Sequence, residues 1–291
     1  MPPALPAPLP MRPADSNIRP TFRVPPNSCD THFHVFEPGY APVADPLYSF
    51  PDGTLDQYLR VTRHLGIDRI VLVQPTYYGT DNSLLVDVLR KAGPQCRGVV
   101  RIEENTSDQE LDRFDVLGVR AIRLDLFART SWSTPDLIAY IRRMADRARP
   151  RGWHLQFYTP GTVVRDLLPF FADLEDTFVI DHMGYMKESD GLTSTDFERL
   201  VRILGHGSCH IKLSGPYRIA QDKPLSSVSP LGRDLVSARP DRLVWGSDWP
   251  HLINGQRDTG ELLNLLADWA PTERDRQQIL VDSPQRLFYA H

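Results

Sequence analysis

Eight short apolar runs alternate with eight helical patterns along this chain, and this alternation constrains the fold more than any other feature. The apolar runs predict strands at Cys29–Val35, Arg69–Gln74, Arg97–Ile102, Val119–Leu124, His154–Tyr158, Phe178–Asp181, His210–Leu213 and Leu243–Gly246. The segments between and after them predict helices at Leu55–Leu65, Ser83–Ala92, Asp108–Leu117, Pro135–Ala148, Val163–Leu174, Thr195–Leu204, Leu231–Ala238 and Gly260–Ala270. Strands that alternate with helices build parallel sheets, and eight such pairs predict an α/β fold, a single (β/α)8 TIM barrel of about 250 residues.

The ends of these helices carry suitable capping residues. Thr54, Ser107 and Thr134 stand where helices begin. Glycines stand where four helices should end, at Gly66, Gly93, Gly118 and Gly152. A doubly wound open sheet is the alternative, but it predicts a glycine-rich phosphate loop, and the sequence contains no G-x-G-x-x-G or Walker motif. A final helix, predicted at Glu273–Leu287, could close the bottom or a side of the barrel.

The chain begins with a proline-rich arm. Nine prolines fall within the first 26 residues, which carry few large apolar groups and lack the apolar core of a signal peptide. We expect residues 1–26 to be extended or disordered, or to pack on a neighbouring subunit. Residues 27–291 form the predicted barrel, because no linker implies a second domain.

Charge and cysteine content exclude several classes of protein. The formal net charge of the 291 residues is −4, so no basic excess favours nucleic acid, and no run of about 18 apolar residues favours a membrane span. The three cysteines, Cys29, Cys96 and Cys209, are scattered, which disfavours a disulfide framework. We therefore expect a cytoplasmic protein, a monomer or a small homo-oligomer, with no nucleic-acid or membrane partner.

Polar residues collect at the carboxyl ends of the predicted strands, where barrel enzymes place their active sites. His32 and His34 lie two apart on a strand, so their side chains point to the same side and can converge on one ligand. Later strand ends and the loops after them carry Gln74, Thr76, Arg123, Asp125, Arg129, Tyr158, His182, Ser214, Tyr217, Arg218, Asp248, His251 and Asn254.

Most of these residues also have a purely structural interpretation. Arg123 and Arg129 could be paired surface groups, Arg218 could be solvated, and Asp125 and Asp181 could be helix caps or ion-pair partners. His154 begins a strand and is assigned to the bottom of the barrel. Asp248 is harder to explain in this way, because it ends an apolar strand and an unpaired buried carboxylate is costly.

Three motifs carry a resemblance to a known family. Asp30-Thr-His-Phe-His34, Ile180-Asp-His-Met-Gly184 and Trp245-Gly-Ser-Asp-Trp-Pro-His251 resemble the amidohydrolase superfamily, in its second amidohydrolase family. The Gly79-Thr-Asp-Asn82 segment and the six-residue spacing of Arg123 and Arg129 are similar to its 2-pyrone-4,6-dicarboxylate lactonase-like branch, and the resemblance runs from about Asn27 to the C-terminus. It implies a (β/α)8 hydrolase of aromatic degradation that opens a small anionic lactone by attack of an activated water on the ring carbonyl.

Matched onto this chain, the resemblance assigns roles to individual residues. Asp248 is the general base, and His32, His34 and His182 lie around the scissile carbonyl. Positions that hold substrate carboxylates match Arg123, Arg129 and Arg218. Further substrate contacts match Thr76, Tyr158, Tyr48, His251 and Asn254, with Thr76 standing where a serine is expected.

The resemblance also bears on metal binding. Binuclear members of the superfamily use a carboxylated Lys or a Glu after strand 4 and a His after strand 5, where this chain has Arg123 and Tyr158. An arginine offers no lone pair and repels a cation, so a two-metal centre is not expected. His32, His34, His182 and Asp248 form a four-ligand set for one Zn2+, but lactonases of this branch work without metal, and we expect no cofactor here.

Other functions remain open from sequence. A sugar-acid lactone isomerase or lactonase (galactarolactone-like), or a 4-sulfomuconolactone hydrolase, could use the same residues, because a sulfonate suits the arginines as a carboxylate does. A metal-dependent decarboxylase is a weaker alternative. A barrel that binds an acidic ligand without turnover is weaker still, because a binder of anions gains nothing from Asp248 beside its ligand.

Overall fold

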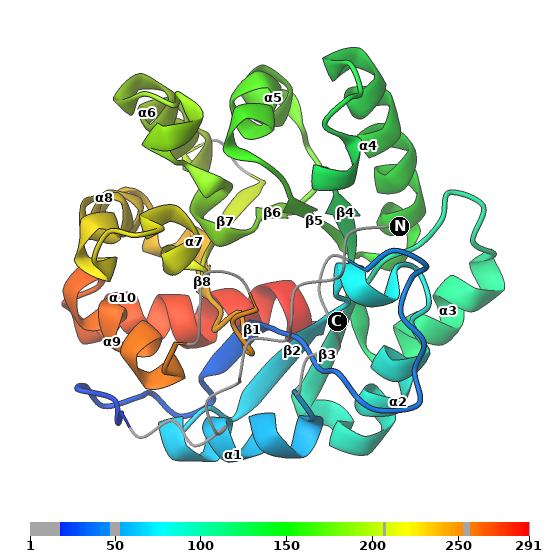
Figure 1. The fold of residues 1–291 in the computed structure, drawn as a ribbon, viewed down its shortest axis with the longest axis horizontal. Coiled ribbons are helices and arrows are strands. Elements are labelled where there is room, and N and C mark those ends of the chain that lie inside the picture. The colour runs from blue at the N-terminus through cyan, green and yellow to red at the C-terminus, as the bar shows by residue number, and fades with distance from the viewer. Residues whose placement is uncertain (1–17, 47–52, 206–207, 253–256, 291) are drawn as a thin grey trace, which may run out of the picture.

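The computed structural model describes residues 18–46, 53–205, 208–252 and 257–290, and within them eight parallel strands follow one another in chain order around a barrel (Figure 1). The strands are β1 (Cys29–Phe33), β2 (Arg69–Val73), β3 (Cys96–Val100), β4 (Val119–Asp125), β5 (His154–Tyr158), β6 (Phe178–Ile180), β7 (Cys209–Leu213) and β8 (Leu243–Trp245). The predicted (β/α)8 barrel is therefore confirmed, with strand ends that differ from the expected ones by at most two residues.

Helices surround the strands (Figure 1). They are α1 (Leu55–Leu65), α2 (Ser83–Ala92), α3 (Asp108–Leu117), α4 (Thr134–Ala148), α5 (Gly161–Asp173), α6 (Ser194–Leu204), α7 (Pro216–Ala220), α8 (Ser229–Ala238), α9 (Thr259–Trp269) and α10 (Glu273–Gln277). The sequence did not predict α7, a five-residue helix in the loop after β7, because it is too short to show a helical period.

The helix starts show how far capping chemistry predicts local structure. Thr54 and Gln57 form a reciprocal capping box at α1, and the Ser107 side chain accepts from the Glu110 amide at α3. The expected cap at Thr134 is wrong by one residue, because Ser133 accepts from the Asp136 amide and Thr134 is the first helical residue. Gly66, Gly93, Gly118 and Gly152 all adopt positive φ where a helix ends.

The barrel closes between β1 and the segment that follows β8. The Asp248 amide donates to the His32 carbonyl at 2.8 Å, and the His34 amide donates to the Trp249 carbonyl at 2.9 Å. A glycine is required at 246, since a Cβ there would lie 2.5 Å from the His32 Cβ. Closure therefore brings the first and last site motifs of the chain into direct contact.

The C-terminal segment closes the bottom of the barrel, which is one of the two positions expected for it. The predicted helix is shorter than expected: α10 gives way to π-helical turns at Gln278–Asp282 and Gln285–Tyr289. Leu287 and Phe288 pack with the inward apolar side chains Cys29, Val71, Val73, Val99, Ala121, Val179 and Val244. The His154 ring lies 4.9 Å from the Phe288 ring, which confirms its place at the bottom.

The described part of the N-terminal arm lies on the outside of the barrel. The Thr21 amide donates to Asn264 of α9 at 2.7 Å, and the His64 ring of α1 lies 3.3 Å from the Ile18 carbonyl. Residues 1–17 of the predicted arm lie outside the described residues. In the described part of the chain, no helix is both long enough and apolar enough to cross a bilayer.

Candidate active site

Asp248 lies at the centre of a cluster of three histidines at the carboxyl ends of β1, β6 and β8. The Nε2 atoms of His34, His32 and His182 lie 3.6, 3.7 and 3.9 Å from the Asp248 Oδ1. The Nε2 atoms of His32 and His34 are 3.3 Å apart. All four side chains are almost fully buried, and we call them the acid–histidine cluster.

The two oxygens of Asp248 have different surroundings. Oδ2 accepts hydrogen bonds from the Tyr217 hydroxyl and, at 2.6 Å, from the Arg218 Nε. Oδ1 has no hydrogen-bond partner among the residues that the structure describes. The carboxylate is thus fixed through Oδ2 and presents Oδ1 to the three imidazoles. A buried acceptor without a partner is costly unless a ligand or a water molecule donates to it.

The backbone of the site is held in an uncommon conformation. Asp248 has φ +58° and His182 has φ +52°, and Met183 and Tyr185 beside His182 also adopt positive φ. Such φ values are sparsely populated by residues other than glycine and are tolerated where the surrounding structure imposes them. Here they turn the side chains at 182 and 248 inward directly after β6 and β8.

The cluster combines an ionised carboxylate with neutral imidazoles. Burial raises the pKa of Asp248, but the Arg218 guanidinium and the neighbouring imidazoles outweigh burial and hold this pKa well below its usual range. Burial lowers the pKa of His182 to about 3 and holds the pKa of His32 well below its usual value. At neutral pH the cluster therefore contains a proton acceptor surrounded by uncharged hydrogen-bonding groups.

A buried ion pair that the sequence did not predict lies beneath the cluster. The Lys212 ammonium on β7 is 3.2 Å from the Asp181 Oδ1, and both side chains are fully buried. It donates to the His32 Nδ1 and to the Thr31 carbonyl, each at 3.1 Å. The signal was present in the sequence, because His210 and Lys212 share one face of β7, Ser214 follows the strand in the same phase, and a lysine in that phase points into the barrel.

Arginines collect on the other side of the site, around the carboxyl ends of β3 and β4. The Asp125 Oδ2 accepts from the Thr76 hydroxyl at 3.0 Å and lies 3.5 Å from the Arg101 Nη1. Arg129 donates to the Asp125 carbonyl at 2.8 Å and lies over the Tyr140 ring. We call Arg101, Arg123, Arg129, Thr76 and Asp125 the arginine side.

Arg123 connects the two groups. Its Nη1 donates to the Gln74 carbonyl at 3.0 Å, its Nε lies 3.9 Å from the Asp181 Oδ2, and its guanidinium covers the Tyr158 ring at 4.3 Å. Within the described part of the chain, the Nε atoms of Arg123 and Arg129 and the Nη1 of Arg101 are buried without a hydrogen-bond partner. Free, buried guanidinium N–H groups are donors that an anionic ligand can use.

The structure thus brings most of the expected site residues together. His32, His34, His182 and Asp248 form one cluster, with Arg218 bonded to Asp248. The His251 ring is buried and packs on Tyr217 at 5.9 Å, and its amide donates to the Asp248 carbonyl. Tyr48 and Asn254 lie outside the described residues. Lys212, Arg101 and Tyr185, which accepts from Arg218 at 3.1 Å, were missed by the sequence reasoning.

The spacing of the cluster fits one divalent metal ion. His32, His34 and Asp248 offer ligand atoms within 4.8 Å of one another, and His182 Nε2 lies beside them without a hydrogen-bond partner among the described residues. Ligands about 2.1 Å from a tetrahedral Zn2+ would lie about 3.4 Å apart. A mononuclear ion at these residues is therefore compatible with the distances.

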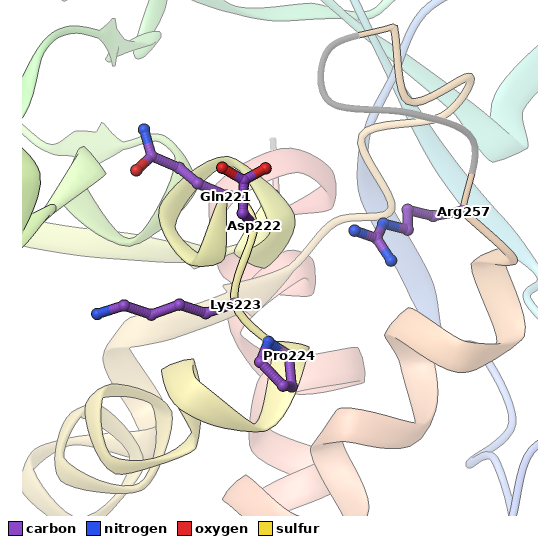
Figure 2. A pocket seen from close by; sticks show the side chains of 5 residues that line it. All are labelled: Gln221, Asp222, Lys223, Pro224 and Arg257. Atoms are coloured by element: carbon purple, nitrogen blue, oxygen red, sulfur yellow. The ribbon is translucent and has the colours of Figure 1, made fainter.

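A surface cavity lies at the same end of the barrel but does not include the cluster. It has a volume of about 730 Å3 and is lined by Gln221, Asp222, Lys223, Pro224 and Arg257. Figure 2 shows Arg257, from the loop before α9, extending toward the turn after α7 that carries Asp222 and Pro224. Because its lining includes neither Asp248 nor any of the three histidines, we locate the candidate active site by its chemistry rather than by this cavity.

Comparison with known proteins agrees with the geometry. The amidohydrolase family model matches residues 29–289. A 2-pyrone-4,6-dicarboxylate hydrolase from Comamonas testosteroni is 33% identical over 93% of this chain and 93% of its own length. A 4-sulfomuconolactone hydrolase from Hydrogenophaga intermedia is 32% identical over 92% of this chain and 90% of its own length.

A solved structure resembles the whole barrel. A Pseudomonas putida protein proposed to be a 2-pyrone-4,6-dicarboxylic acid hydrolase has a TM-score of 0.78 and 30% identity. The match covers 92% of this chain and 98% of that chain. The shared region therefore extends well beyond the three site motifs.

Proposed function

This chain belongs to the amidohydrolase family, and we propose that it hydrolyses a carboxylated lactone of the 2-pyrone-4,6-dicarboxylate type, with Asp248 as the general base. The observation that carries the proposal is the Asp248 Oδ1, a buried carboxylate oxygen without a hydrogen-bond partner among the described residues and within 3.9 Å of three imidazole Nε2 atoms. A carboxylate in this setting can accept a proton from a water molecule that attacks a carbonyl carbon held between it and the histidines.

The charges of the site support an anionic substrate. The acid–histidine cluster, the ion pair beneath it and the arginine side contain the cations Arg101, Arg123, Arg129, Lys212 and Arg218 against the carboxylates Asp125, Asp181 and Asp248. A further carboxylate, Asp30, is bonded to Tyr58 on the far side of β1, and burial raises its pKa. The excess of cations favours a ligand with two negative charges, although the whole chain carries a net charge of −4.

The substrate carboxylates are proposed to bind at the arginine side. Arg123 and Arg129 offer unpartnered Nε–H groups, and Thr76 and Tyr158 lie beside them. Charge-assisted hydrogen bonds to these groups would fix the ring and lower the entropic part of the barrier. Arg218 is bonded to Asp248 and Tyr185, so we assign it to holding the base. The contacts expected of Tyr48, His251 and Asn254 stay predictions.

In the proposed reaction, water adds to the lactone carbonyl while Asp248 Oδ1 takes its proton. The negative charge that develops on the carbonyl oxygen is stabilised by a hydrogen bond from His32, whose neutral ring is an Nε2–H donor. The ring C–O bond then breaks, and the leaving oxygen receives a proton from Asp248. An anionic substrate beside Asp248 also raises its low pKa, which makes the carboxylate a stronger base in the complex than in the free enzyme.

We propose that this reaction needs no metal, because fixed N–H donors and neighbouring cations already face the reacting position. If one divalent ion is bound, His32, His34, His182 and Asp248 would hold it, and it would polarise the carbonyl as a Lewis acid. The chain is further proposed to be a cytoplasmic enzyme, monomeric or a small homo-oligomer, with no nucleic-acid or membrane partner.

A second substrate class has a specific observation in its favour. A sulfonate accepts hydrogen bonds from guanidinium groups as a carboxylate does, and a relative at 32% identity is a 4-sulfomuconolactone hydrolase. The arginine side therefore also suits a lactone that carries one carboxylate and one sulfonate.

The decisive experiment follows the ultraviolet absorbance of 2-pyrone-4,6-dicarboxylate on addition of chelator-treated enzyme, with and without added Zn2+. Rapid loss without metal, with the ring-opened acid as the NMR product, is expected. Loss that requires Zn2+ would assign the cluster to metal binding. If this lactone is stable under both conditions, the same assay with 4-sulfomuconolactone and a sugar-acid lactone decides between the alternatives, and an isomerised product in place of a hydrolysed one would contradict the proposed reaction.

A further inference from the structure

We infer that Lys212 fixes the tautomer of His32, so that the Nε2 of His32 carries a proton and acts as a hydrogen-bond donor in the site rather than as a metal ligand. Lys212 lies on β7, which is separated from β1 only by β8 in the closed barrel, and its side chain has no exposed surface. Lys212 belongs to none of the three sequence motifs that mark the site.

The contacts of the ammonium group define the direction of each hydrogen bond. Lys212 donates to the Thr31 carbonyl and to the His32 Nδ1, each at 3.1 Å. An ammonium group has no acceptor, so the His32 Nδ1 must be the acceptor in this bond. A neutral imidazole with a lone pair on Nδ1 carries its proton on Nε2.

Asp181 competes for the same nitrogen but is less well placed. Its Oδ1 lies 3.4 Å from the His32 Nδ1 and 3.2 Å from the Lys212 Nζ, and it has no hydrogen-bond partner among the described residues. The nearby charge of Asp181 instead keeps Lys212 protonated against the effect of burial, which lowers the pKa of this lysine. The ion pair thus provides a charged donor at the one nitrogen of His32 that faces away from the reacting position.

The neighbouring histidine completes the pattern. The His34 Nδ1 lies 2.7 Å from the Val73 carbonyl, so it must donate its proton there, and the His34 Nε2 of the neutral ring is a lone pair. The His32 Nε2–H can therefore donate across the 3.3 Å that separate the two Nε2 atoms, and it can turn this donation to a substrate oxygen. Each ring therefore has one tautomer, which is fixed by the partner of its Nδ1 atom: Val73 on β2 for His34 and Lys212 on β7 for His32.

The tautomer inferred for His32 is not compatible with a metal ion bound at its Nε2. A histidine ligand uses a lone pair on the coordinating nitrogen and donates the proton of its other nitrogen to a carboxylate or a carbonyl. At His32 the other nitrogen faces an ammonium donor, so the spacing of the cluster fits a divalent ion while the protonation of His32 does not. Removal of Lys212 would let the His32 Nδ1–H donate to Asp181 and would release the Nε2 lone pair.

The first test reads the tautomer without substrate and so does not depend on the proposed function. Protein labelled with 15N-histidine is studied by long-range 1H–15N correlation at pH 7.5, with the His32 signals assigned by their loss in His32→Gln. A protonated Nε2 with an unprotonated Nδ1 is expected for His32. The opposite tautomer in the wild-type protein would overturn the inference, whatever the variants do.

The second test uses Lys212→Met, with Lys212→Gln as the matched variant that keeps a neutral N–H donor. In Lys212→Met the His32 tautomer should invert and Zn2+ affinity, measured by titration calorimetry, should rise about 10-fold or more. In Lys212→Gln the wild-type tautomer should be retained. Unchanged Zn2+ affinity in a folded Lys212→Met protein with an inverted tautomer would contradict the link to metal binding.

The kinetic arm rests on the proposed function. With a lactone that the wild-type enzyme turns over, Lys212→Met should lower kcat about 10- to 100-fold with little change in KM, because one hydrogen-bond donor to the developing oxyanion is lost. Lys212→Gln should recover part of this loss. If the tautomer is as inferred but no lactone is turned over, the proposed function fails while the inference stands. Equal kcat in all three proteins would show that Lys212 has no positioning role.

Discussion

The two halves of the site, the acid–histidine cluster and the arginine side, differ in how completely their polar groups are paired by hydrogen bonds. In the acid–histidine cluster, Asp248 Oδ2, His34 Nδ1 and His32 Nδ1 each have defined partners from other segments of the chain. Asp248 Oδ1 and His182 Nε2, which have no hydrogen-bond partner among the described residues, lie 3.9 Å apart. On the arginine side, only Arg101 lies near the Asp125 carboxylate, while Arg129 donates to the Asp125 backbone carbonyl and Arg123 to the Gln74 carbonyl. All three guanidinium groups retain a buried N–H group without a hydrogen-bond partner in the described structure.

The difference in pairing agrees with the two roles proposed for these groups. Proton transfer needs groups held in one protonation state and one orientation, which the dense pairing around Asp248 provides. Recognition of an anion needs donors that the protein itself leaves free, which the excess of arginine provides. A variant in one half should therefore affect kcat, and a matched variant in the other half should affect KM.

The largest effect is expected from exchange of Asp248, with Asp125 as the matched carboxylate on the other side. Asp248→Asn should lower kcat about 10²- to 10⁴-fold while calorimetry still detects substrate binding, because the amide cannot take a proton from water. Asp125→Asn should change kcat only a few-fold and raise KM, because it loosens Thr76 and Arg101. Near-normal kcat in a folded Asp248→Asn protein would remove Asp248 as the base.

A smaller effect is expected from Arg129→Met. Loss of one charge-assisted contact to a substrate carboxylate should raise KM about 10- to 100-fold with a minor change in kcat. The matched control is Arg143→Met, which removes an exposed arginine paired with Glu104 on the outer surface. Steady-state kinetics on 2-pyrone-4,6-dicarboxylate checks both variants, and an unchanged KM in Arg129→Met would show that Arg129 does not bind a substrate carboxylate.

The smallest effect concerns how the free energy of unfolding depends on pH. This measurement needs no substrate and distinguishes the histidines of the site from the arginine side. Burial lowers the pKa of His182 to about 3 and that of His251 to about 4, below the unfolded value near 6.5. Below about pH 6.5 the unfolded chain binds more protons than the folded protein. The free energy of unfolding should therefore fall as the pH drops from about 6.5 toward 4, by at most about 1.4 kcal/mol per pH unit for each histidine.

Urea unfolding at pH 7.5 and pH 5 measures this loss. His251→Gln should reduce the difference between the two pH values, while Arg129→Met should retain it, because arginine does not titrate in this range. His64→Gln, at a half-buried histidine on α1, is the control for the loss of a histidine outside the site. A difference between pH 7.5 and pH 5 that is the same in His251→Gln as in the wild-type protein would assign the pH dependence to other groups.

Much of the fold was predictable because its signals are local. The period of apolar residues located every strand and eight of the helices, and the caps at Thr54 and Ser107 are side-chain contacts within three residues. The error at Thr134 and the missed α7 arose where two neighbouring residues can cap the same helix and where a helix is too short to show a period. The π-helical turns after Gln277 depend on packing into the bottom of the barrel.

The sequence was sufficient to predict most residues of the candidate site, but not the hydrogen bonds and ion pairs between them. Motif resemblance and strand ends identified Asp248 and the three histidines, since parallel strands must present their carboxyl ends at one face. Lys212 was missed because a charged residue in the middle of a strand shows no motif. The bond from the Arg218 Nε to Asp248, at 2.6 Å, was also not predicted. Pairing of this kind depends on distances between strands that are far apart in sequence.

The sequence alone was sufficient to predict the βα alternation, the caps at Thr54 and Ser107, and the set of residues that can reach the carboxyl face, because each depends on periodicity or on contacts between near neighbours. The tertiary structure decided which oxygen of Asp248 stays open, which nitrogen of His32 meets Lys212, and which arginines stay unpaired. Closure of β8 onto β1 and the positive φ at residues 182 and 248 set these distances. Protonation and hydrogen-bond direction follow from groups that meet only when the barrel is closed, so no single segment of the chain contains them.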